Sequence, residues 1–237
     1  MNRVLVWFSC GAASAVSAKL AIEKYENVEV LYCDTFAYEH PDNRRFFDDV
    51  QNWIGQEIKI LKSTEFSDIY DVFYKTKWLV GVQGARCTTE LKKKLRFSYQ
   101  EPDDIHVIGY TREEENRIQK FKRNNPELLV DWIIRDKNMT KRECLLMLDD
   151  AGIELPTMYK LGYKNNNCIG CVKGGMGYWN KIRVDFPEMF ERMAQCEWNL
   201  NATIHKGIFL SELDPNAGDF PNEPDISCGV QCSLDLQ

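Results

Sequence analysis

Small residues connect an apolar run to a helix-forming segment near the start of this chain, between Val4 and Leu20. The apolar run is typical of a buried strand that ends at Ser9, and strong helix formers follow from about Ser14. The first N–H groups of a helix have no partner within the helix, and the helix dipole adds roughly half a positive charge there. Because small side chains also let a phosphate approach the backbone, the segment predicts an anion-binding turn. An ordinary strand-to-helix turn is the alternative.

Predicted strands and helices alternate through the first half of the chain. Apolar runs predict strands at 3–9, 28–33, 57–61 and 105–110, and periodic patterns predict helices at 14–25, 41–54, 66–78 and 87–97. Such alternation requires right-handed crossovers, which makes an α/β fold with a parallel sheet. Parallel sheets bind ligands at the carboxyl ends of their strands, where the small-residue turn lies.

The sequence pattern changes after about residue 125. We predict an α/β core at 1–125 and a helical, cysteine-rich part at 126–237 that packs on it. Thr140 and Glu143 form a capping box for a helix that ends at about residue 150, and 185–199 predicts a further amphipathic helix. The tail beyond residue 213 has no periodic pattern.

The net charge of −6 over 237 residues does not attract a nucleic acid, which is itself negatively charged. The basic clusters at 92–96 and 117–123 are typical of solvated helix faces, but they leave a nucleic-acid acceptor open. No apolar run reaches the roughly 18 residues of a membrane span, so we expect no membrane partner. The N-terminus lacks the layout of a signal peptide, which predicts a cytoplasmic protein. The sequence also leaves a homo-oligomer open.

Nine cysteines are many for a protein of a reducing compartment, where they indicate metal or redox chemistry rather than disulfides. Cys168 and Cys171 form a C-x-x-C, and Cys228 and Cys232 form a second close pair. Together they predict a four-thiolate site for zinc or an iron–sulfur cluster. Such a site would also hold down a tail that has no core of its own. Unremarkable loop thiols or a reversible disulfide are the alternatives.

A fifth cysteine, Cys87, lies at a predicted helix start between Arg86 and Lys92. Positive neighbours and a helix N-terminus favour the thiolate form of a cysteine, so Cys87 is a candidate nucleophile or a further metal ligand. The remaining cysteines lie in apolar patterns and are predicted to be buried spectators: Cys10, Cys33, Cys144 and Cys196.

Polar residues follow two further predicted strands. Asp34 and Thr35 end the second strand, where a carboxylate suits ribose hydroxyls or a magnesium ion and a hydroxyl suits a base. Gly109 ends the fourth strand, and Arg117 follows it in a position where anionic groups would gather. A capped turn and a solvated helix start are the alternatives.

The order of these motifs resembles the PP-loop adenine-nucleotide superfamily. It runs from the small-residue turn through Asp-Thr, R-C-T-x-x-L-K and G-x-x-R-x-E-x-x-R to Asp-Trp, Tyr-x-x-Gly-Tyr and C-x-x-C. Within the superfamily, residues 3–175 are most similar to the phosphoadenosine phosphosulfate (PAPS) reductases and their sulfur-transfer relatives. The resemblance implies an adenine nucleotide alpha-hydrolase-like fold: five mostly parallel strands with helices on both faces, here with a C-terminal cysteine-containing extension.

The resemblance also assigns residues. It implies that ATP, PAPS or adenylylsulfate (APS) is bound by Ser9, Gly11, Ala12, Ala13, Ser14, Asp34, Thr35, Arg86, Lys92, Gly109 and Arg117. It implies a [4Fe–4S] cluster at Cys168 and Cys171, for which the cysteine pairs themselves leave zinc as the alternative metal, and the carboxylate of Asp34 leaves magnesium as a further ion.

The chain departs from the family at three places. Cys10 replaces a glycine and Ala13 an acidic residue of the ATP-cleaving members, whereas the reductases have looser turns of this kind. APS reductases have two adjacent cysteines where this chain has Cys87-Thr88, so Cys228 or Cys232 would supply the missing ligand. Cys228 also resembles the nucleophile of the PAPS reductases, but its pairing with Cys232 favours a ligand.

These features predict an enzyme of sulfur transfer or sulfonucleotide reduction, with Cys87 as its catalytic thiol. Its partners would be a nucleotide and either a thiol donor or a nucleic-acid acceptor. A non-catalytic nucleotide sensor, or a subunit of a nucleic-acid-modification system with structural zinc, is the alternative that Ala13 favours.

Overall fold

The structure, a computed structural model, describes residues 2–81 and 84–226, which fall into two compact units. We call residues 1–36, 40–62 and 95–166 the sheet unit, and residues 37–39, 63–94 and 167–237 the cysteine unit. Each unit therefore draws on segments far apart in the sequence. The division of the sequence at residue 125 stays a prediction. None of the helices in the described ranges is long and apolar enough to cross a membrane.

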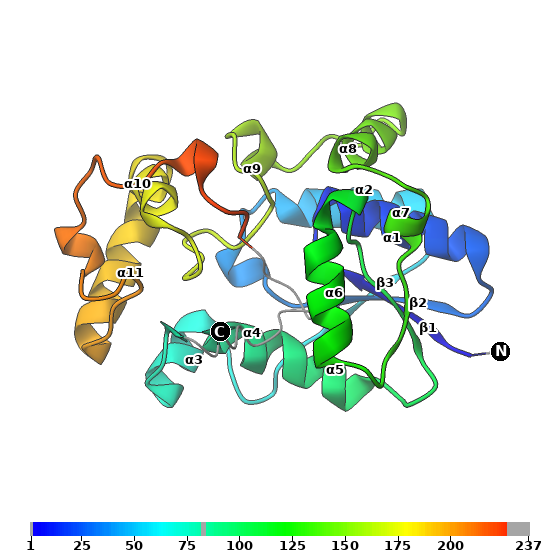
Figure 1. Cartoon of the computed structure of the whole chain (residues 1–237), viewed down its shortest axis with the longest axis horizontal. Coiled ribbons are helices and arrows are strands. Elements are labelled where there is room, and N and C mark those ends of the chain that lie inside the picture. The colour runs from blue at the N-terminus through cyan, green and yellow to red at the C-terminus, as the bar shows by residue number, and fades with distance from the viewer. Residues whose placement is uncertain (1, 82–83, 227–237) are drawn as a thin grey trace. The chain divides into compact units, whose positions relative to one another are not determined.

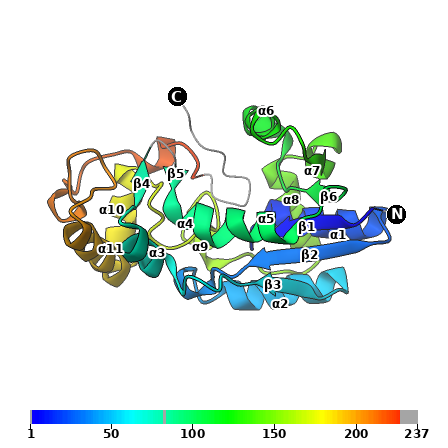
Figure 2. The same cartoon turned by 90° about the horizontal axis from the view of Figure 1, so that it is seen from below.

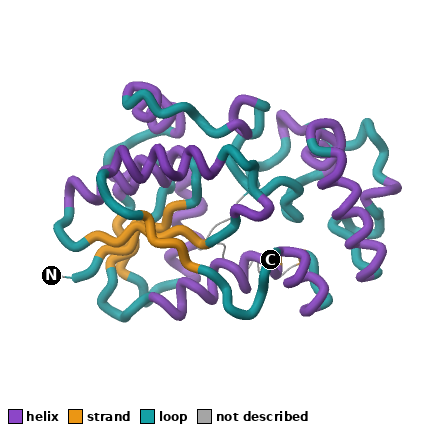
Figure 3. The backbone as a smooth tube through the Cα atoms, turned by 180° about the vertical axis from the view of Figure 1, so that it is seen from behind, coloured by secondary structure: helices purple, strands orange, loops and turns teal. Residues whose placement is uncertain are grey.

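The sheet unit is built on a parallel sheet, as the sequence predicted. In the described part of the chain its five strands stand in the order β3-β2-β1-β6-β7. The strands are Val4–Phe8 (β1), Val28–Cys33 (β2), Ile58–Leu61 (β3), Ile105–Val107 (β6) and Leu129–Asp131 (β7). The labels β6, β1, β2 and β3 follow one another in Figure 2, and Figure 3 shows the strands as one orange group. β1 is central, so its carboxyl end has neighbours on both sides.

Helices cover both faces of this sheet. The helices of the sheet unit are α1 (Ala12–Lys24), α2 (Asn43–Ile54), α5 (Lys94–Tyr99), α6 (Glu115–Asn124), α7 (Ile133–Asp136), α8 (Lys141–Asp150) and α9 (Thr157–Lys160), with a 3₁₀ turn at η3 (Arg112–Glu114). A further 3₁₀ turn, η1 (Phe36–Tyr38), has residues in both units. Figure 1 shows α1, α2 and α8 above the strands and α5 below them. Side chains of β1, α1, α2 and α8 share the main core, which includes Val6, Val16, Phe46 and Leu148. This confirms the predicted α/β class with helices on both faces.

The capping box predicted at residue 140 is present. The Thr140 hydroxyl accepts a hydrogen bond from the Glu143 N–H at 3.1 Å, and the Glu143 carboxylate accepts one from the Thr140 N–H at 2.6 Å. These two bonds satisfy backbone donors that the first turn of α8 leaves without helical partners. Local sequence alone therefore sets the start of this helix.

The cysteine unit is mainly helical. Its elements are α3 (Ile69–Thr76), β4 (Val80–Gly81), β5 (Gly84–Ala85), α4 (Arg86–Thr88), the π-helical η2 (Thr89–Lys93), α10 (Met176–Asp185), α11 (Pro187–Leu200), η4 (Leu210–Glu212) and η5 (Phe220–Asn222). Trp179 of α10 is fully buried, and its ring lies edge-on to that of Phe190 in α11, with 6.2 Å between centroids. The sequence did not predict α10, whose first N–H groups bind a distant carboxylate: Gly177 and Tyr178 donate to Glu223 at 2.6 and 2.9 Å.

Candidate functional site

The small-residue turn lies where the sequence placed it, between the carboxyl end of β1 and the first residue of α1. The Ser14 hydroxyl organises this turn. It accepts hydrogen bonds from the N–H groups of Ser9 at 3.1 Å and Gly11 at 3.3 Å, and it donates to the Gly11 carbonyl at 2.9 Å. The turn is therefore shaped from within before any ligand arrives. It joins the amino end of a 13-residue helix to a central strand end, which is the geometry of an anion site.

Cys10 lies in the turn with a backbone conformation that favours glycine. Its φ is +53°, in the left-handed region that costs a residue with a side chain roughly 1–2 kcal/mol. Its side chain is fully buried, and its carbonyl accepts a hydrogen bond from the Asn166 amide at 2.6 Å. The same amide group donates to the side chain of Asn43 at 2.8 Å. These contacts hold the strained backbone in place, so the turn keeps its shape without the glycine.

Gly109 lies against the first turn of α1. A Cβ atom at this position would stand 2.8 Å from the Ser14 nitrogen and 2.9 Å from both the Ala13 carbonyl carbon and the Ser14 Cα. All three are backbone atoms, which cannot move aside as a flexible side chain can. The segment after β6 and the turn after β1 thus meet at a point where only glycine fits.

Asp34 and Thr35 also lie at this edge, because β2 runs parallel to β1. The Asp34 carboxylate forms an ion pair with Lys62 at 3.1 Å and is a quarter exposed. Thr35 is almost fully buried, and its hydroxyl lies 3.0 Å from the Tyr32 hydroxyl and 3.2 Å from the Cys33 carbonyl. The fold therefore presents the carboxylate at the edge and uses the threonine within the core.

Arg117 belongs to α6 of the sheet unit. Its guanidinium lies over the ring of Tyr110, 4.3 Å from the centroid, and forms an ion pair with Glu114. Tyr110 in turn stacks on Trp132 with an interplanar angle of 4°. The arginine is thus placed by an aromatic stack and remains about one third exposed.

Three cysteines line one pocket of the cysteine unit. The pocket encloses about 340 Å³, part of it open to solvent, and Cys87, Cys168 and Cys171 lie in its wall. The other lining residues are Tyr38, Ile69, Phe73, Thr88, Lys92, Gly170 and Val172. The fold therefore brings the predicted catalytic thiol to the predicted ligand pair, although 80 residues of sequence lie between them. Apart from Lys92, the surroundings of these thiols are largely apolar.

The C-x-x-C loop is held by hydrogen bonds from two directions. The Tyr178 hydroxyl donates to the Cys168 carbonyl at 3.1 Å and accepts from the Cys171 N–H at 3.0 Å. The Ile169 N–H donates to the Tyr38 carbonyl at 2.9 Å. Gly170 has a φ of +71°, which turns the chain back so that both cysteines reach the same pocket.

The donor chemistry of this loop suits a soft metal centre, since thiolates select zinc and iron–sulfur clusters. Cys168 and Cys171 are both buried, at 8% and 7% exposure, which suits a closed site. Cys228 and Cys232, the other two predicted ligands, lie outside the described residues. Within the described ranges, no group of three or more Cys, His, Asp or Glu side chains is arranged to hold a metal ion.

Arg86 lies on α4 and pairs with the buried Glu90 at 2.7 Å. Lys94 forms a second ion pair with the same carboxylate. Both basic side chains are largely exposed, whereas the Glu90 side chain is completely covered. One buried acid thus fixes two basic side chains: Arg86, which the resemblance assigned to the nucleotide, and Lys94 of the basic cluster at 92–96. The other predicted spectator cysteines, Cys33, Cys144 and Cys196, are buried as expected, as is Cys10.

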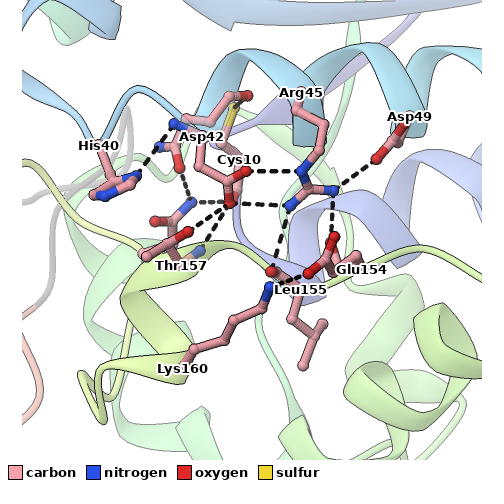
Figure 4. Close-up of polar contacts among 11 residues, drawn as sticks. Cys10, His40, Asp42, Arg45, Asp49, Glu154, Leu155, Thr157 and Lys160 are labelled. Atoms are coloured by element: carbon pink, nitrogen blue, oxygen red, sulfur yellow. Dashed lines mark hydrogen bonds and ion pairs between the residues drawn. The ribbon is translucent and has the colours of Figure 1, made fainter.

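Sequence reasoning missed a network that holds the start of α9 to α2 (Figure 4). Asp42 accepts hydrogen bonds from the Thr157 N–H at 2.9 Å and the Thr157 hydroxyl at 3.0 Å. Arg45 binds both carboxylate oxygens of Asp42 and donates to the carbonyls of Glu154 at 3.0 Å and Leu155 at 3.4 Å. Because more than 100 residues separate the partners, no local pattern could have revealed it.

This network predicts a pH-dependent contribution to stability. The hydrogen bonds from Arg45, and then those from Thr157, hold the pKa of the Asp42 carboxyl well below its ordinary value of 3.8. The folded state therefore binds fewer protons than the unfolded state at moderately acidic pH. The stabilisation is complete above about pH 4 and is lost as the pH falls through the folded pKa. Urea unfolding between pH 7 and pH 2 should show this loss, and Asp42→Asn should flatten it.

At neutral pH, Asp42→Asn is expected to lower the free energy of unfolding by about 2 kcal/mol, since bonds to a charged acceptor are lost. Asp49→Asn is the matched control, because Asp49 also pairs with Arg45, at 2.7 Å, on the exposed side of α2. An exposed pair of this kind contributes about 0.5 kcal/mol. Equal losses of stability in the two variants would show that the hydrogen bonds from Thr157 to Asp42 add nothing to the free energy of unfolding.

The chain was compared with known proteins and families. Residues 3–174 match the family model described as the phosphoadenosine phosphosulfate reductase domain. The match spans well over half of the 237 residues and includes the turn after β1, Gly109 and the C-x-x-C loop. No curated protein matches the chain significantly. The family match confirms the resemblance that the order of the motifs predicted.

Proposed function

The chain belongs to the phosphoadenosine phosphosulfate reductase family, and from this premise we propose that it is a sulfonucleotide-related enzyme that performs sulfur transfer or sulfonucleotide reduction. The adenine nucleotide, either ATP or a sulfonucleotide such as PAPS or APS, would bind at the turn after β1. The observation that carries this proposal is the preformed turn of residues 9–14, seated at the amino end of α1 and closed by Gly109.

In this proposal the N–H groups at the start of α1 bind phosphate or sulfonate oxygens, because they have no helical partners. The Asp34 carboxylate, at the neighbouring strand end, suits ribose hydroxyls or a magnesium ion. Arg117 adds positive charge for anionic groups. Thr35 contributes through its place in the core, since its hydroxyl already lies within hydrogen-bonding distance of Tyr32 and Cys33.

The reductive version of the reaction begins with the Cys87 thiolate. It attacks the sulfonate sulfur, and a sulfur–sulfur bond forms as the bond between that sulfur and the phosphate oxygen breaks. The nucleotide leaves with the electron pair on its phosphate oxygen. A second thiol then attacks the Cys87 sulfur and releases sulfite, so that two thiols are oxidised to a disulfide and the sulfonate sulfur gains two electrons. Lys92, which lines the same pocket, provides positive charge near the thiolate.

In the transfer version, ATP activates an acceptor oxygen as an adenylate with release of pyrophosphate. The outer sulfur of a cysteine persulfide, loaded by a persulfide donor, then forms a bond to the acceptor carbon, and AMP leaves with the bonding electrons. A second thiol attacks the carrier cysteine's sulfur and breaks the sulfur–sulfur bond, which releases the thiolated acceptor and leaves a disulfide. The acceptor is a nucleic acid or a small molecule. Both versions need the same parts, namely an anion cradle and a reactive thiolate.

Cys168 and Cys171 would provide two thiolates to an iron–sulfur cluster or a zinc ion, and Cys228 and Cys232 would provide the remaining two. Cys87, which shares the pocket, is the alternative partner for the described pair. A cluster supplies redox or sulfur-binding chemistry, whereas zinc supplies folding free energy. Thiol chemistry of this kind fits the reducing cytoplasm in which we place the enzyme.

The proposal is tested with the full chain purified without oxygen. We expect calorimetry to detect binding of at least one adenine nucleotide, with or without magnesium. Incubation with PAPS or APS and a dithiol should release sulfite in the reductive version, whereas ATP with a nucleic-acid acceptor should release AMP and pyrophosphate in the transfer version. If no adenylate binds, the proposal is wrong. If nucleotides bind but every turnover assay is negative and zinc is stoichiometric, the chain is a nucleotide sensor.

A further inference from the structure

A tyrosine from the last sequence segment of the sheet unit contacts the turn after β1. Tyr159 lies on α9, and its hydroxyl accepts a hydrogen bond from the N–H of Ala12, the first residue of α1, at 3.4 Å. A backbone bond from Asn166 also reaches this oxygen. Tyr159 begins the Tyr-x-x-Gly-Tyr motif, to which neither the sequence nor the proposed function assigned a role.

Three hydroxyl groups surround the open side of Gly11. A Cβ atom placed on this glycine would lie 3.7 Å from the Ser9 hydroxyl, 3.7 Å from the Tyr159 hydroxyl and 3.9 Å from the Ser14 hydroxyl. The space that the missing side chain leaves is therefore ringed by oxygen atoms that can donate hydrogen bonds. It lies beside the first N–H groups of α1, where a phosphate would be attracted.

The three hydroxyls differ in the hydrogen bonds that they donate. The Ser14 proton is donated to the Gly11 carbonyl, and the Ser9 hydroxyl can donate to Ser14 at 3.2 Å. Tyr159 instead accepts from backbone N–H groups, and among the described residues no hydrogen bond donated by its hydroxyl is found. Burial raises the pKa of Tyr159, so the proton stays on the oxygen at neutral pH. It is thus the hydroxyl whose proton remains for a ligand.

From this geometry we infer that Tyr159 is a third hydroxyl of the phosphate cradle and donates a hydrogen bond to a phosphate or sulfonate oxygen of the bound nucleotide. The inference rests on the proposed function, because it assumes that the turn of residues 9–14 binds an adenine nucleotide. It extends that function by making the segment of α9 part of the site.

The network around Asp42 explains how α9 is fixed for this task. Asp42 binds both polar groups of Thr157, the first residue of α9, and Tyr159 follows two positions later. Asn166, a few residues beyond α9, binds the Cys10 carbonyl within the turn itself. The segment is therefore held at both ends, so the hydroxyl is placed before the ligand arrives, which avoids an entropic cost on binding.

The test is the Tyr159→Phe variant, which removes only the hydroxyl. Calorimetry with adenosine, AMP and ADP is expected to show a loss of affinity on the order of tenfold for the two phosphate-bearing ligands, since a hydrogen bond to a charged group is lost. The affinity for adenosine should stay within about twofold, because adenosine carries no anion for the cradle. Thermal unfolding of each variant is measured alongside.

Tyr25→Phe is the matched control. Tyr25 caps the opposite end of α1, and its hydroxyl donates to Asp131 at 2.8 Å, so this variant loses a similar bond without touching the turn. Its nucleotide affinities should equal those of the wild-type chain. Equal weakening of adenosine and AMP by Tyr159→Phe would indicate a purely structural role and overturn the inference. Unchanged AMP affinity in the variant would overturn it too, whereas a wild-type chain that binds no adenylate would refute the proposed function and the inference together.

Discussion

Alanine in place of Gly109 is expected to abolish measurable nucleotide binding and to lower the free energy of unfolding by about 3 kcal/mol. The added methyl group would stand 2.8–2.9 Å from backbone atoms of Ala13 and Ser14. Relief of this overlap requires the first turn of α1 to move away from β6. That movement would break the bonds by which Ser14 shapes the turn, so the anion site and the local packing fail together. Calorimetry with AMP and urea unfolding measure the two effects.

Gly152→Ala is the matched control for this prediction. Gly152 follows α8 with a φ of +71° and has nothing within 4 Å of an added Cβ. The same substitution there costs about 1 kcal/mol of backbone strain and leaves the turn after β1 untouched. We therefore expect a modest loss of stability with unchanged nucleotide affinity. Wild-type affinity in Gly109→Ala would show that the turn does not hold the nucleotide.

Alanine at Cys168 or Cys171 is expected to abolish the metal binding that we propose for the C-x-x-C and to eliminate turnover. Structural zinc contributes about 10–16 kcal/mol of apparent binding free energy in small domains, and a centre that loses one thiolate ligand loses much of this. Metal analysis and the visible absorption spectrum after oxygen-free purification measure the loss directly. They also distinguish a coloured iron–sulfur cluster from colourless zinc. Cys228→Ala tests the ligand predicted in the tail.

Cys144→Ala is the control for the loss of a buried thiol. Burial in α8 raises the pKa of Cys144 to about 12, so this thiol stays protonated at neutral pH, and Cys144 does not line the pocket of Cys168 and Cys171. Its replacement removes one core sulfur and should cost some stability while the metal content stays at the wild-type level. Full metal occupancy in both the Cys168→Ala and Cys171→Ala variants would refute the assignment of the C-x-x-C as a metal site.

The fold was predictable to the extent that local patterns carried it. The strand at Val28–Cys33 was predicted at its observed bounds, and the capping box at Thr140 set the start of α8. The fourth predicted strand was too long, because pairing with β1 ends at Val107. α10 escaped prediction because it directly follows a stretch rich in glycine and asparagine, and its first N–H groups are satisfied by Glu223 from far along the chain.

The residues of the candidate site also fall into those that local sequence identified and those that only the tertiary structure revealed. The residues of the turn after β1 were identified from their own spacing, since a strand, small residues and a helix start follow one another directly. The sequence showed Tyr159 as part of a motif but predicted no role for it, because its contact with Ala12 spans 147 residues. Thr35 was predicted to contact the nucleotide, but only the structure showed that its hydroxyl lies against Tyr32 in the core.

Sequence by itself thus determined the α/β class, the parallel sheet, the place of the small-residue turn between β1 and α1, and the family. These depend on hydrophobic periodicity and on short spacings, which the chain carries locally. Tertiary structure decided that Cys87 shares a pocket with Cys168 and Cys171, that Gly109 must lack a side chain, and that α9 reaches the turn. Such contacts arise from packing between distant segments, and no local stretch of residues encodes the partner that it will meet.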